Sequence, residues 1–297
     1  MMISVIIPSY NSESTIEKCI KALKDQSYAG QYEIILVDSS MDRTPEIVSS
    51  LFPEITYHHF ENKTDPGTAR NRGLELAQGE IIAFIDSDCV AERDWLESIA
   101  RHHSEEYRVV GGVVCNGNDP ASNVAWAGYM AEFREFLPEM PPREVEHIPT
   151  CNISYKRSIF HDYGFFQGRY YPQEDLVFNH ALRENGERIL CHPSIRIHHN
   201  HRTVLRDFLE HQKRIGAITS RVLKTLSLEG AFIARSRVMA LLMMPLLPLV
   251  KFFRTISVFL RYQPGTLFKR PVAVLIFFIG LSYWIRGFVK GVFDKPM

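Results

Sequence analysis

The sequence predicts an α/β fold, a doubly wound and mostly parallel sheet with helices on both faces. Through the first 90 residues, short apolar runs alternate with amphipathic stretches of about ten residues, which is typical of consecutive βαβ units. One run, residues 80–85, is continuously apolar after its first residue and ends in two carboxylates, Asp86 and Asp88. Because such runs suit strands covered on both faces, we expect this strand at the centre of the sheet.

Three further strands are predicted before it. They cover residues 3–7, which Pro8 closes, residues 32–37, which end at Asp38, and residues 55–59. Apolar residues spaced i, i+3, i+4 and i+7 favour a helix over residues 16–23. Thr44 is expected to cap the next helix, with Pro45 at its first position and residues 47, 48 and 51 as its apolar face. A third helix opens at residues 66–68 and ends before Gly79.

Composition and charge limit the class of protein that this chain can be. Of the 297 residues, 45% are hydrophobic and 23% charged, which describes a globular chain of one large domain or two ordinary ones. Residues 231–297 contain ten Lys or Arg and one acidic residue, so the formally neutral chain has a basic end and an acidic body. Long aliphatic runs separate these basic residues, which favours an anionic membrane surface over nucleic acid. The five cysteines form no CxxC pair, and we expect reduced thiols.

Polar residues follow three of the predicted strands. They are residues 9–11, Asp38, and Asp86 with Asp88. Parallel α/β sheets bind ligands beyond the carboxyl ends of their strands, so these residues are expected to border a nucleotide crevice. Carboxylate oxygens there suit Mg²⁺ or Mn²⁺ carrying a diphosphate, although turn aspartates in solvent give the same pattern. The sequence has neither GxGxxG nor GxxxxGK[ST], so a dinucleotide fingerprint and a P-loop are not supported.

Four motifs in the first 90 residues resemble the family 2 glycosyltransferases of GT-A fold. They are residues 5–11 (VIIPSYN), 36–38 (LVD), 67–73 (GTARNRG) and 84–88 (FIDSD). The likeness continues in residues 150–157, in the Glu-Asp pair at 174–175 with residues 181–186, and in residues 195–198, and it covers residues 3–215. It implies a GT-A type sheet, and the tail beyond residue 215 is not diagnostic of the family.

The resemblance also implies roles for single residues. Asp175 would be the general base that deprotonates the acceptor hydroxyl, and Glu174 would exchange roles with it if the helix phase is shifted. Asp88, with or without Asp86, would hold a divalent metal, Mn²⁺ or Mg²⁺. His198, at the end of its strand, would be a ligand of the metal or of the phosphate. The nucleotide-sugar would be bound by seven residues: Pro8, Tyr10, Asn11, Asp38, Arg70, Asp86 and Asn152. No role is assigned to the histidine pair at 58–59.

Each of these roles has a plainer alternative. Tyr10 would otherwise pack on the sheet edge, Arg70 would pair with Glu75 or Glu61 on a helix surface, and the Glu-Asp pair would only cap a helix. Two positions depart from the family pattern: Ser39 stands where a second acidic residue is frequent, and the Gln-x-x-Arg-Trp motif of processive synthases is missing. The second departure favours the addition of a single sugar.

The C-terminal part is predicted to be helical and to lie at a membrane. Residues 203–226 form a predicted long helix, and two apolar stretches follow, residues 238–250 and 272–285, of 13 and 14 residues. Both are shorter than the roughly 20 residues that span a bilayer, so we expect interfacial or re-entrant helices on the cytoplasmic leaflet. The alternative is a soluble helical domain or an oligomer interface. The predicted domains are residues 1–226, catalytic, and 227–297, the tail.

The leading hypothesis is a metal-dependent, inverting glycosyltransferase of cell-envelope polysaccharide or glycolipid synthesis. It would move one sugar from a nucleotide-sugar, UDP-sugars first and GDP-sugars second, to a lipid-linked or glycan acceptor at the cytoplasmic face of the membrane. Two other classes are weighed against it. A nucleotidyltransferase would need a glycine-rich basic loop after the first strand, which residues 9–13 lack. A non-catalytic binding module is disfavoured because Asp88 and Asp175 are both present.

Overall fold

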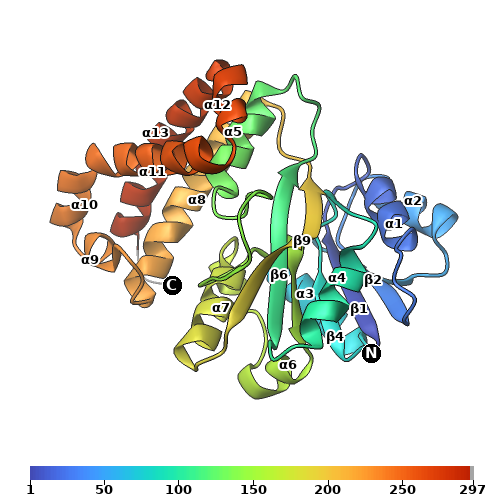
Figure 1. The fold of residues 1–297 in the computed structure, drawn as a ribbon. Helices are drawn as coiled ribbons and strands as arrows, with labels where there is room; N and C mark the ends of the chain where they lie inside the picture. The colour runs from blue at the N-terminus through green and yellow to red at the C-terminus, as the bar shows by residue number, and fades with distance from the viewer. Residues whose placement is uncertain (295–297) are drawn as a thin grey trace. The chain divides into compact units, whose positions relative to one another are not determined.

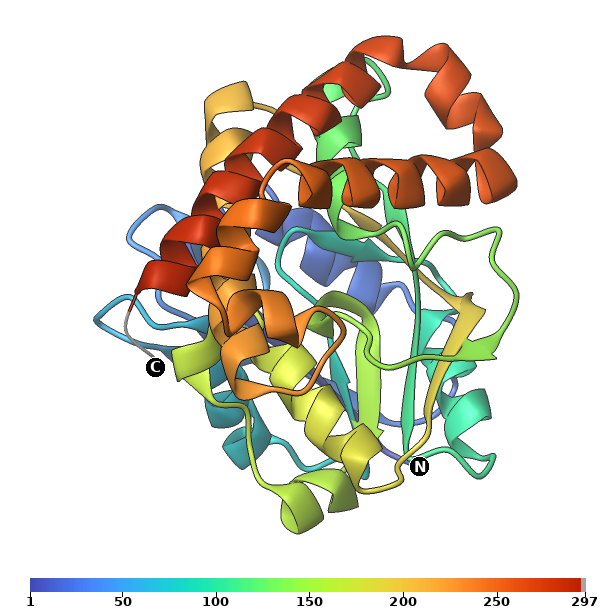
Figure 2. The ribbon, with the colours of Figure 1, turned by 90° about the vertical axis from the view of Figure 1, so that its left-hand side faces the viewer.

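The computed structural model describes residues 1–294, which fall into two compact units (Figures 1 and 2). Unit 1 comprises Met1–Gly117 and Met140–Asn200, and unit 2 comprises Asn118–Glu139 and His201–Met297. This division differs from the predicted boundary after residue 226. Helix α8 (Leu205–Thr225) packs along α13 (Pro271–Phe293) and therefore belongs with the C-terminal helices, as does a segment from the middle of the chain.

Unit 1 is built on one mixed sheet with the strand order β3-β2-β1-β4-β8-β6-β9-β5, and β7 pairs with β9. The strands are β1 (Ile3–Ser9), β2 (Tyr32–Asp38), β3 (Thr56–His59), β4 (Ile81–Phe84), β5 (Cys89–Ala91), β6 (Val109–Asn116), β7 (Arg143–Glu144), β8 (Ile153–Lys156) and β9 (Ile189–His199). The four strands predicted in the first 90 residues are thus present. Pro8 does not close the first strand: it lies within β1 opposite Val37, and the strand continues to Ser9.

The sheet has two parts that differ in strand direction. Strands β3, β2, β1 and β4 are mutually parallel, as predicted for a doubly wound sheet, and β4 lies inside the sheet. Strand β8 is antiparallel to both β4 and β6, β6 is parallel to β9, and β5 is antiparallel to β9. The parallel part brings the carboxyl ends of β1, β2 and β4 to one edge.

The helices of unit 1 connect these strands. They are α1 (Ile16–Lys24), α2 (Thr44–Leu51), α3 (Pro66–Leu76), α4 (Trp95–His103), α6 (Ser158–Tyr163) and α7 (Glu174–Glu184), with 3₁₀ turns η1 (Thr150–Asn152) and η2 (Gly168–Tyr170). The expected apolar face of α1 is buried in full. The prediction for α2 was wrong in two details. Thr44 is the first residue of the helix and Arg43 its N-cap, without a side-chain cap hydrogen bond, and Asp42 Oδ1 accepts from the Thr44 amide at 3.0 Å. Leu51 is 49% exposed.

The core of unit 1 holds α3 and α7 in place. Helix α3 lies close against β1, since a Cβ added at Gly73 would be 2.4 Å from Ile6 Cγ2. Aromatic rings also join the sheet to the helices, with Phe84 edge-on to Tyr155 at 6.0 Å and Tyr155 edge-on to Phe178 of α7 at 5.8 Å between centroids. Such ring pairs stabilise beyond their buried area. The start of α7 is therefore fixed relative to the end of β4.

Unit 2 is helical. Its helices are α5 (Asn123–Glu132), α8, α9 (Ala231–Ala234), α10 (Arg237–Met243), α11 (Leu246–Tyr262), α12 (Pro264–Lys269) and α13. Helices α8 and α13 lie side by side (Figures 1 and 2) and approach closely at two glycines. A Cβ at Gly216 would be 1.9 Å from the Trp284 carbonyl oxygen, and one at Gly287 would be 1.9 Å from that of Lys213. Only glycine permits this backbone contact.

The C-terminal helices are longer than the predicted apolar stretches. Helix α13 continues past Ile285 through Arg286 and Lys290 and reaches 23 residues, long and apolar enough to cross a membrane by length and composition alone. The pair α10 and α11 passes the same test only as one broken span, bent by 57°. Buried core helices also pass it, and 44% of the α13 window is buried. Membrane association is thus only weakly indicated.

Candidate active site

The centre of the candidate site is a buried guanidinium, Arg70 of α3. Asp65 caps this helix by accepting from the Thr68 amide at 3.0 Å, and the first turns carry Arg70 under the end of β4. Arg70 is 3% exposed. Its Nη2 donates to Asp86 Oδ1 at 2.7 Å and its Nη1 to Glu174 Oε1 at 2.8 Å. Arg70 therefore joins the carboxyl end of β4 to the first turn of α7, and neither Glu75 nor Glu61 is its partner.

Two carboxylates accept hydrogen bonds from this guanidinium, and the negative charge of a third, Asp175, also acts on it. Burial opposes the charge on Arg70, but Asp86 and Glu174 outweigh it and raise the pKa of the guanidinium above its usual value. Burial raises the pKa of Glu174 to about 7, against the pull of Arg70, and the negative charges of Asp175 and Asp86 add to the rise. Burial first, and the neighbouring negative charges second, make Glu174 a carboxyl that takes up a proton near neutral pH.

Glu174 and Asp175 are adjacent in sequence but have different surroundings. Glu174 is 4% exposed and held by Arg70. Asp175 is half-buried; its Oδ1 accepts from the Leu176 amide at 2.7 Å and its Oδ2 from the Thr150 amide at 3.1 Å. Both carboxyls also lie in the first turn of α7, as the capping alternative expected. Asp175 is thus the one with access to solvent.

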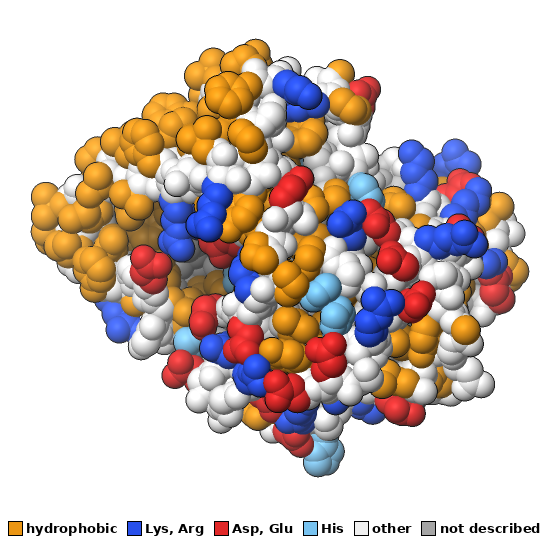
Figure 3. Space-filling view, viewed as in Figure 1, with side chains coloured by type: hydrophobic (Ala, Val, Ile, Leu, Met, Phe, Trp, Pro, Cys, Tyr) orange, Lys and Arg blue, Asp and Glu red, His pale blue; other side chains and the backbone are white. Residues whose placement is uncertain are grey.

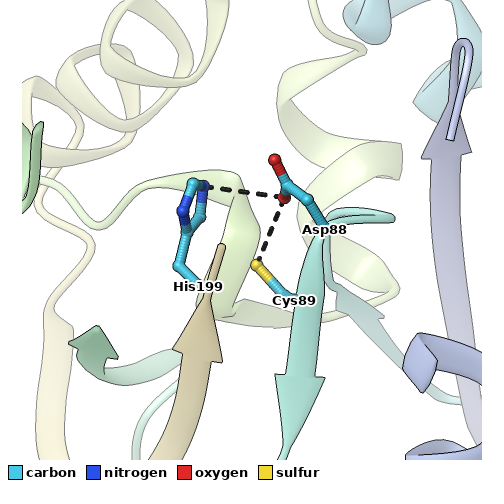
Figure 4. Close-up of side chains that lie close together, drawn as sticks. All are labelled: Asp88, Cys89 and His199. Atoms are coloured by element: carbon cyan, nitrogen blue, oxygen red, sulfur yellow. Dashed lines mark hydrogen bonds and ion pairs between the residues drawn. The ribbon is translucent and has the colours of Figure 1, made fainter. Parts of the chain in front are cut away.

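A second group of side chains follows the turn after β4. Asp88, Cys89 and His199 each offer a ligand atom, and these atoms all lie within 4.8 Å of one another. Figure 4 shows the thiol and the imidazole directed at the same Asp88 carboxylate, each 3.6 Å from Oδ1. Oxygen and imidazole nitrogen fit Mn²⁺, and a thiol adds affinity for softer ions. The donor set therefore fits a divalent transition metal better than Mg²⁺.

His198 does not belong to this group. Strands β5 and β9 pair Cys89 with His199 and Val90 with His198, and neighbouring residues of a strand point to opposite faces. His198 Nε2 consequently lies 3.3 Å from Glu92 Oε1, and the His198 side chain is 42% exposed. The structure therefore brings His199, and not the predicted His198, close to the Asp88 carboxylate. Asp86, the other predicted ligand, has one oxygen on Arg70.

Asp38, at the end of β2, is fully buried and already hydrogen-bonded. Ser40 Oγ donates to its Oδ1 at 2.5 Å, Tyr57 donates to its Oδ2 at 3.2 Å, and His59 Nδ1 lies 3.0 Å from Oδ2. Burial and then Asp38 raise the pKa of Tyr57, which keeps that phenol a donor. Sequence analysis gave His59 no role. The register places it directly opposite Asp38, which could have revealed the contact.

The loop after β1 carries the other predicted donor-side residues. Tyr10 is 37% exposed, and Lys63 Nζ lies 4.1 Å from the centroid of its ring. Asn11 has a left-handed φ of 51° and accepts from the Met41 amide at 2.9 Å, joining this loop to the one after β2. Pro8 is buried within the sheet. Tyr10 and Asn11 are thus both exposed, whereas Pro8 is not.

Asn152 is a core residue and not part of this group. Its Oδ1 accepts from Trp95 Nε1 at 2.8 Å, and its Nδ2 donates to the carbonyl oxygens of Val113 and Ile195 at 2.8 and 3.0 Å. These two carbonyls lie beside the irregularity between β6 and β9, where the regular ladder is interrupted. The fully buried amide thus satisfies backbone groups that the sheet leaves open, and its predicted contact with the nucleotide-sugar is not supported.

Comparison with known sequences identifies the family. Residues 4–164 match the profile described as glycosyl transferase family 2. The glycosyltransferase AglE of Haloferax volcanii is 38% identical over 65% of this chain and 67% of the relative. The chain belongs to glycosyl transferase family 2. It is therefore a glycosyltransferase, as the strand-end motifs predicted.

Other relatives of this glycosyltransferase are longer. The pre-mycofactocin glycosyltransferase of Mycobacterium tuberculosis is 28% identical over 70% of this chain, which spans only 44% of that relative. Among solved structures, Staphylococcus aureus TarS 1–349 in complex with UDP-GlcNAc superposes with a TM-score of 0.57 at 19% identity, covering 98% of this chain and 90% of that one. At this identity the likeness establishes the GT-A fold alone.

Proposed function

We propose that this glycosyltransferase transfers one sugar, with inversion, from a UDP-sugar to an acceptor hydroxyl, with Asp175 as general base. The observation that carries the proposal is the contrast between the two carboxyls at the start of α7. Glu174 is buried on Arg70, whereas Asp175 is accessible and held by two backbone amides. A base must reach the hydroxyl proton, and only Asp175 meets this condition.

The residues around the base divide the remaining work. Arg70 and Glu174 fix the first turn of α7, so that Asp175 keeps its place while it accepts the proton. The amides of Leu176 and Thr150 donate to its two oxygens and hold the carboxylate in one orientation. A single displacement at the anomeric carbon, assisted by a single base, inverts the configuration. Glu174 is then a positioning residue and not an alternative base.

We place the predicted divalent metal at Asp88 and His199. The carboxylate and imidazole would hold Mn²⁺. They would hold Mg²⁺ less well, because only the carboxylate is a ligand that Mg²⁺ prefers. When bound, such an ion stabilises the negative charge of the leaving diphosphate. The imidazole is what favours Mn²⁺ over Mg²⁺ here, whereas the buried thiol of Cys89, whose pKa burial raises, adds affinity only for softer ions.

The nucleotide part of the donor is assigned to the ends of β1 and β2. Tyr10 offers an aromatic face for the base, and His59 covers Asp38 at the neighbouring strand end. A UDP-sugar is proposed because TarS, which shares the fold, was crystallised with UDP and with UDP-GlcNAc. Any contact of Asp38 with the nucleotide would require one of its present partners to move.

We place the enzyme at the cytoplasmic face of the membrane, where a lipid-linked or glycan acceptor would be reached. Helix α13 is apolar, and residues 231–297 carry ten basic residues and one acidic residue. Figure 3 shows hydrophobic side chains gathered over α10 to α13. On α10 and α11, Val238, Leu242 and Phe253 are 66%, 64% and 64% exposed.

A donor panel tests the transfer reaction. Purified full-length protein is incubated with Mn²⁺, UDP- and GDP-sugars, and simple glycan or polyprenyl-phosphate acceptors, and the released nucleotide is identified. Release of nucleoside diphosphate is expected, with loss of release in Asp175→Asn, and the anomeric configuration of the product is read by NMR. Release of pyrophosphate would indicate a nucleotidyltransferase, and retention of configuration would contradict the single displacement.

A further inference from the structure

Strand pairing and main-chain hydrogen bonds bring a thiol, an imidazole and a carboxylate together after β4. Strands β5 and β9 are antiparallel with Cys89 directly opposite His199, and directly opposed residues of such a pair point to the same face of the sheet. Asn200, the residue after His199, donates to the Asp88 carbonyl oxygen from its amide at 2.9 Å and from its Nδ2 at 3.0 Å. The three potential ligands are therefore fixed by the backbone around them.

The spacing of the three ligand atoms fits a small tetrahedral ion. Asp88 Oδ1 lies 3.6 Å from Cys89 Sγ and 3.6 Å from His199 Nε2, and all three ligand atoms lie within 4.8 Å of one another (Figure 4). Zinc bonds of about 2.0 Å to oxygen and nitrogen and about 2.3 Å to sulfur, at tetrahedral angles, place the ligand atoms about 3.3–3.6 Å apart. The two separations from Asp88 are thus already close to those around Zn²⁺.

The sulfur atom determines which ion this set prefers. Mn²⁺ is at the weak end of the divalent first-row series, and thiolate ligands select Zn²⁺. Cys89 is fully buried, whereas the side chains of Asp88 and His199 are 42% and 10% exposed, so an ion enters past the carboxylate and meets the sulfur last. Burial keeps the free thiol protonated by raising its pKa. As the sulfur–zinc bond forms, that proton leaves to solvent.

The two ions leave different numbers of positions for the donor. A tetrahedral Zn²⁺ ion with three protein ligands keeps one open position. Mn²⁺ takes octahedral surroundings, so when Asp88 and His199 alone hold it, several positions stay open. A diphosphate that binds through one oxygen of each phosphate needs two positions, which the zinc-loaded site does not supply.

We propose that Asp88, Cys89 and His199 together form a zinc site, and that Zn²⁺ bound there excludes Mn²⁺ and inhibits the glycosyltransferase. The inhibition rests on the metal role of Asp88 and His199 proposed above. The binding of zinc rests only on the three ligand groups and their spacing. Cys89 is then the residue that decides which divalent ion the site takes.

Cobalt absorption tests the thiol ligand without using activity. Metal-free full-length protein titrated with Co²⁺ is expected to show a thiolate-to-cobalt charge-transfer band in the near ultraviolet, which Zn²⁺ then removes. Cys89→Ser should lose this band and bind Zn²⁺ more weakly by about 100-fold or more, since even an outer-shell partner is worth about 10–100-fold in metal affinity. Cys191→Ser is the matched control, because this buried thiol of β9 donates to the Gly112 carbonyl oxygen at 3.7 Å. It should keep the band and the zinc affinity.

The inhibition is measured as nucleoside diphosphate release at a fixed Mn²⁺ concentration and increasing Zn²⁺. Release should fall in wild type and in Cys191→Ser and recover when more Mn²⁺ is added. Inhibition of Cys89→Ser should need about 100-fold more Zn²⁺, in proportion to its lost affinity. Circular dichroism of both variants shows whether they fold.

Each other outcome has a definite meaning. Absence of the charge-transfer band in wild type, or its persistence in folded Cys89→Ser, overturns the thiol ligand and the zinc site with it. Zinc binding that extra Mn²⁺ does not reverse, or release that Zn²⁺ alone supports as well as Mn²⁺, overturns the inhibition. If no donor yields nucleoside diphosphate, the proposed function fails, while the cobalt spectrum still decides whether the zinc site exists.

Discussion

Replacing Arg70 in the candidate site is expected to destabilise unit 1 far more than replacing Arg72, a surface arginine on the same helix. Arg70→Met keeps the side chain long and apolar but leaves Asp86 and Glu174 without the cation between them. Arg70 is 3% exposed and donates at 2.7 and 2.8 Å. Breaking a buried ion pair from one side costs about 3–5 kcal/mol. For a unit of this size, that corresponds to a melting temperature lower by about 6–20 °C.

The loss should also depend on pH, and its sign follows from Glu174. Its pKa of about 7 in the folded protein exceeds the ordinary 4.5. Between these values the folded state holds a proton that the unfolded state has released, so the free energy of unfolding falls as pH rises. Without Arg70 the folded pKa rises further, and the decline continues to higher pH. The gap between wild type and Arg70→Met is thus larger near pH 8.5 than near pH 6.

Thermal unfolding at the two pH values, followed by circular dichroism, measures both effects. Arg72→Met is the matched control, because Arg72 is on the same helix and pairs with Glu75 at 2.7 Å with side chains 36% and 59% exposed. Exposed pairs contribute about 0.2–1 kcal/mol, so this variant should melt within a few degrees of wild type at both pH values. Equal shifts for the two variants, or a shift for Arg70→Met that does not grow with pH, would refute the reasoning.

Three further predictions concern individual site residues. Asp175→Asn should lower kcat by about 10²-fold or more while calorimetry still shows donor binding near wild type; normal turnover would remove it as the base. Asp88→Asn should lose the Mn²⁺-dependent part of nucleoside diphosphate affinity, and wild-type metal dependence in a titration would contradict the assignment. In that titration, His199→Ala should behave like Asp88→Asn, and His198→Ala should behave like wild type. The opposite result would support His198, as first predicted, and not His199.

The parallel half of the sheet followed from the sequence because its signals are local. Each of β1, β2 and β4 is a mostly apolar run with a polar residue at its end or shortly after it, and the geometry of parallel strands then brings Asp38 and Asp86 to one edge. No long-range information was needed for that step. The same local reasoning failed at Thr44, which is the first residue of α2 and not its cap, and whose amide donates to Asp42 in an Asx turn.

The residues that were misplaced depend on register or on partners distant in sequence. His198 and His199 have equal chemistry, and a strand shifted by one residue exchanges which of them faces Asp88. Asn152 lies at the right strand but satisfies the carbonyls of Val113 and Ile195, an irregularity with no signature in the local sequence. The division of the chain into units also depends on contacts distant in sequence, because residues 118–139 interrupt unit 1 in the sequence but belong to unit 2.

Arg70 shows why a motif can identify a family and still leave a residue's immediate role open. The residues around it in the sequence resemble the family pattern, which suggested that the guanidinium binds the diphosphate. The structure instead commits both terminal nitrogens to carboxylates 16 and 104 positions away. A guanidinium on which three carboxyls act can attract a diphosphate only if one of those carboxyls is neutralised, and Glu174, with its pKa raised to about 7, is the one able to do so. If Arg70 does bind the donor, donor affinity should therefore weaken as pH rises through about 7 in wild type and lose that dependence in Glu174→Gln. Affinity that is flat across this range in wild type would leave Arg70 with the structural role alone.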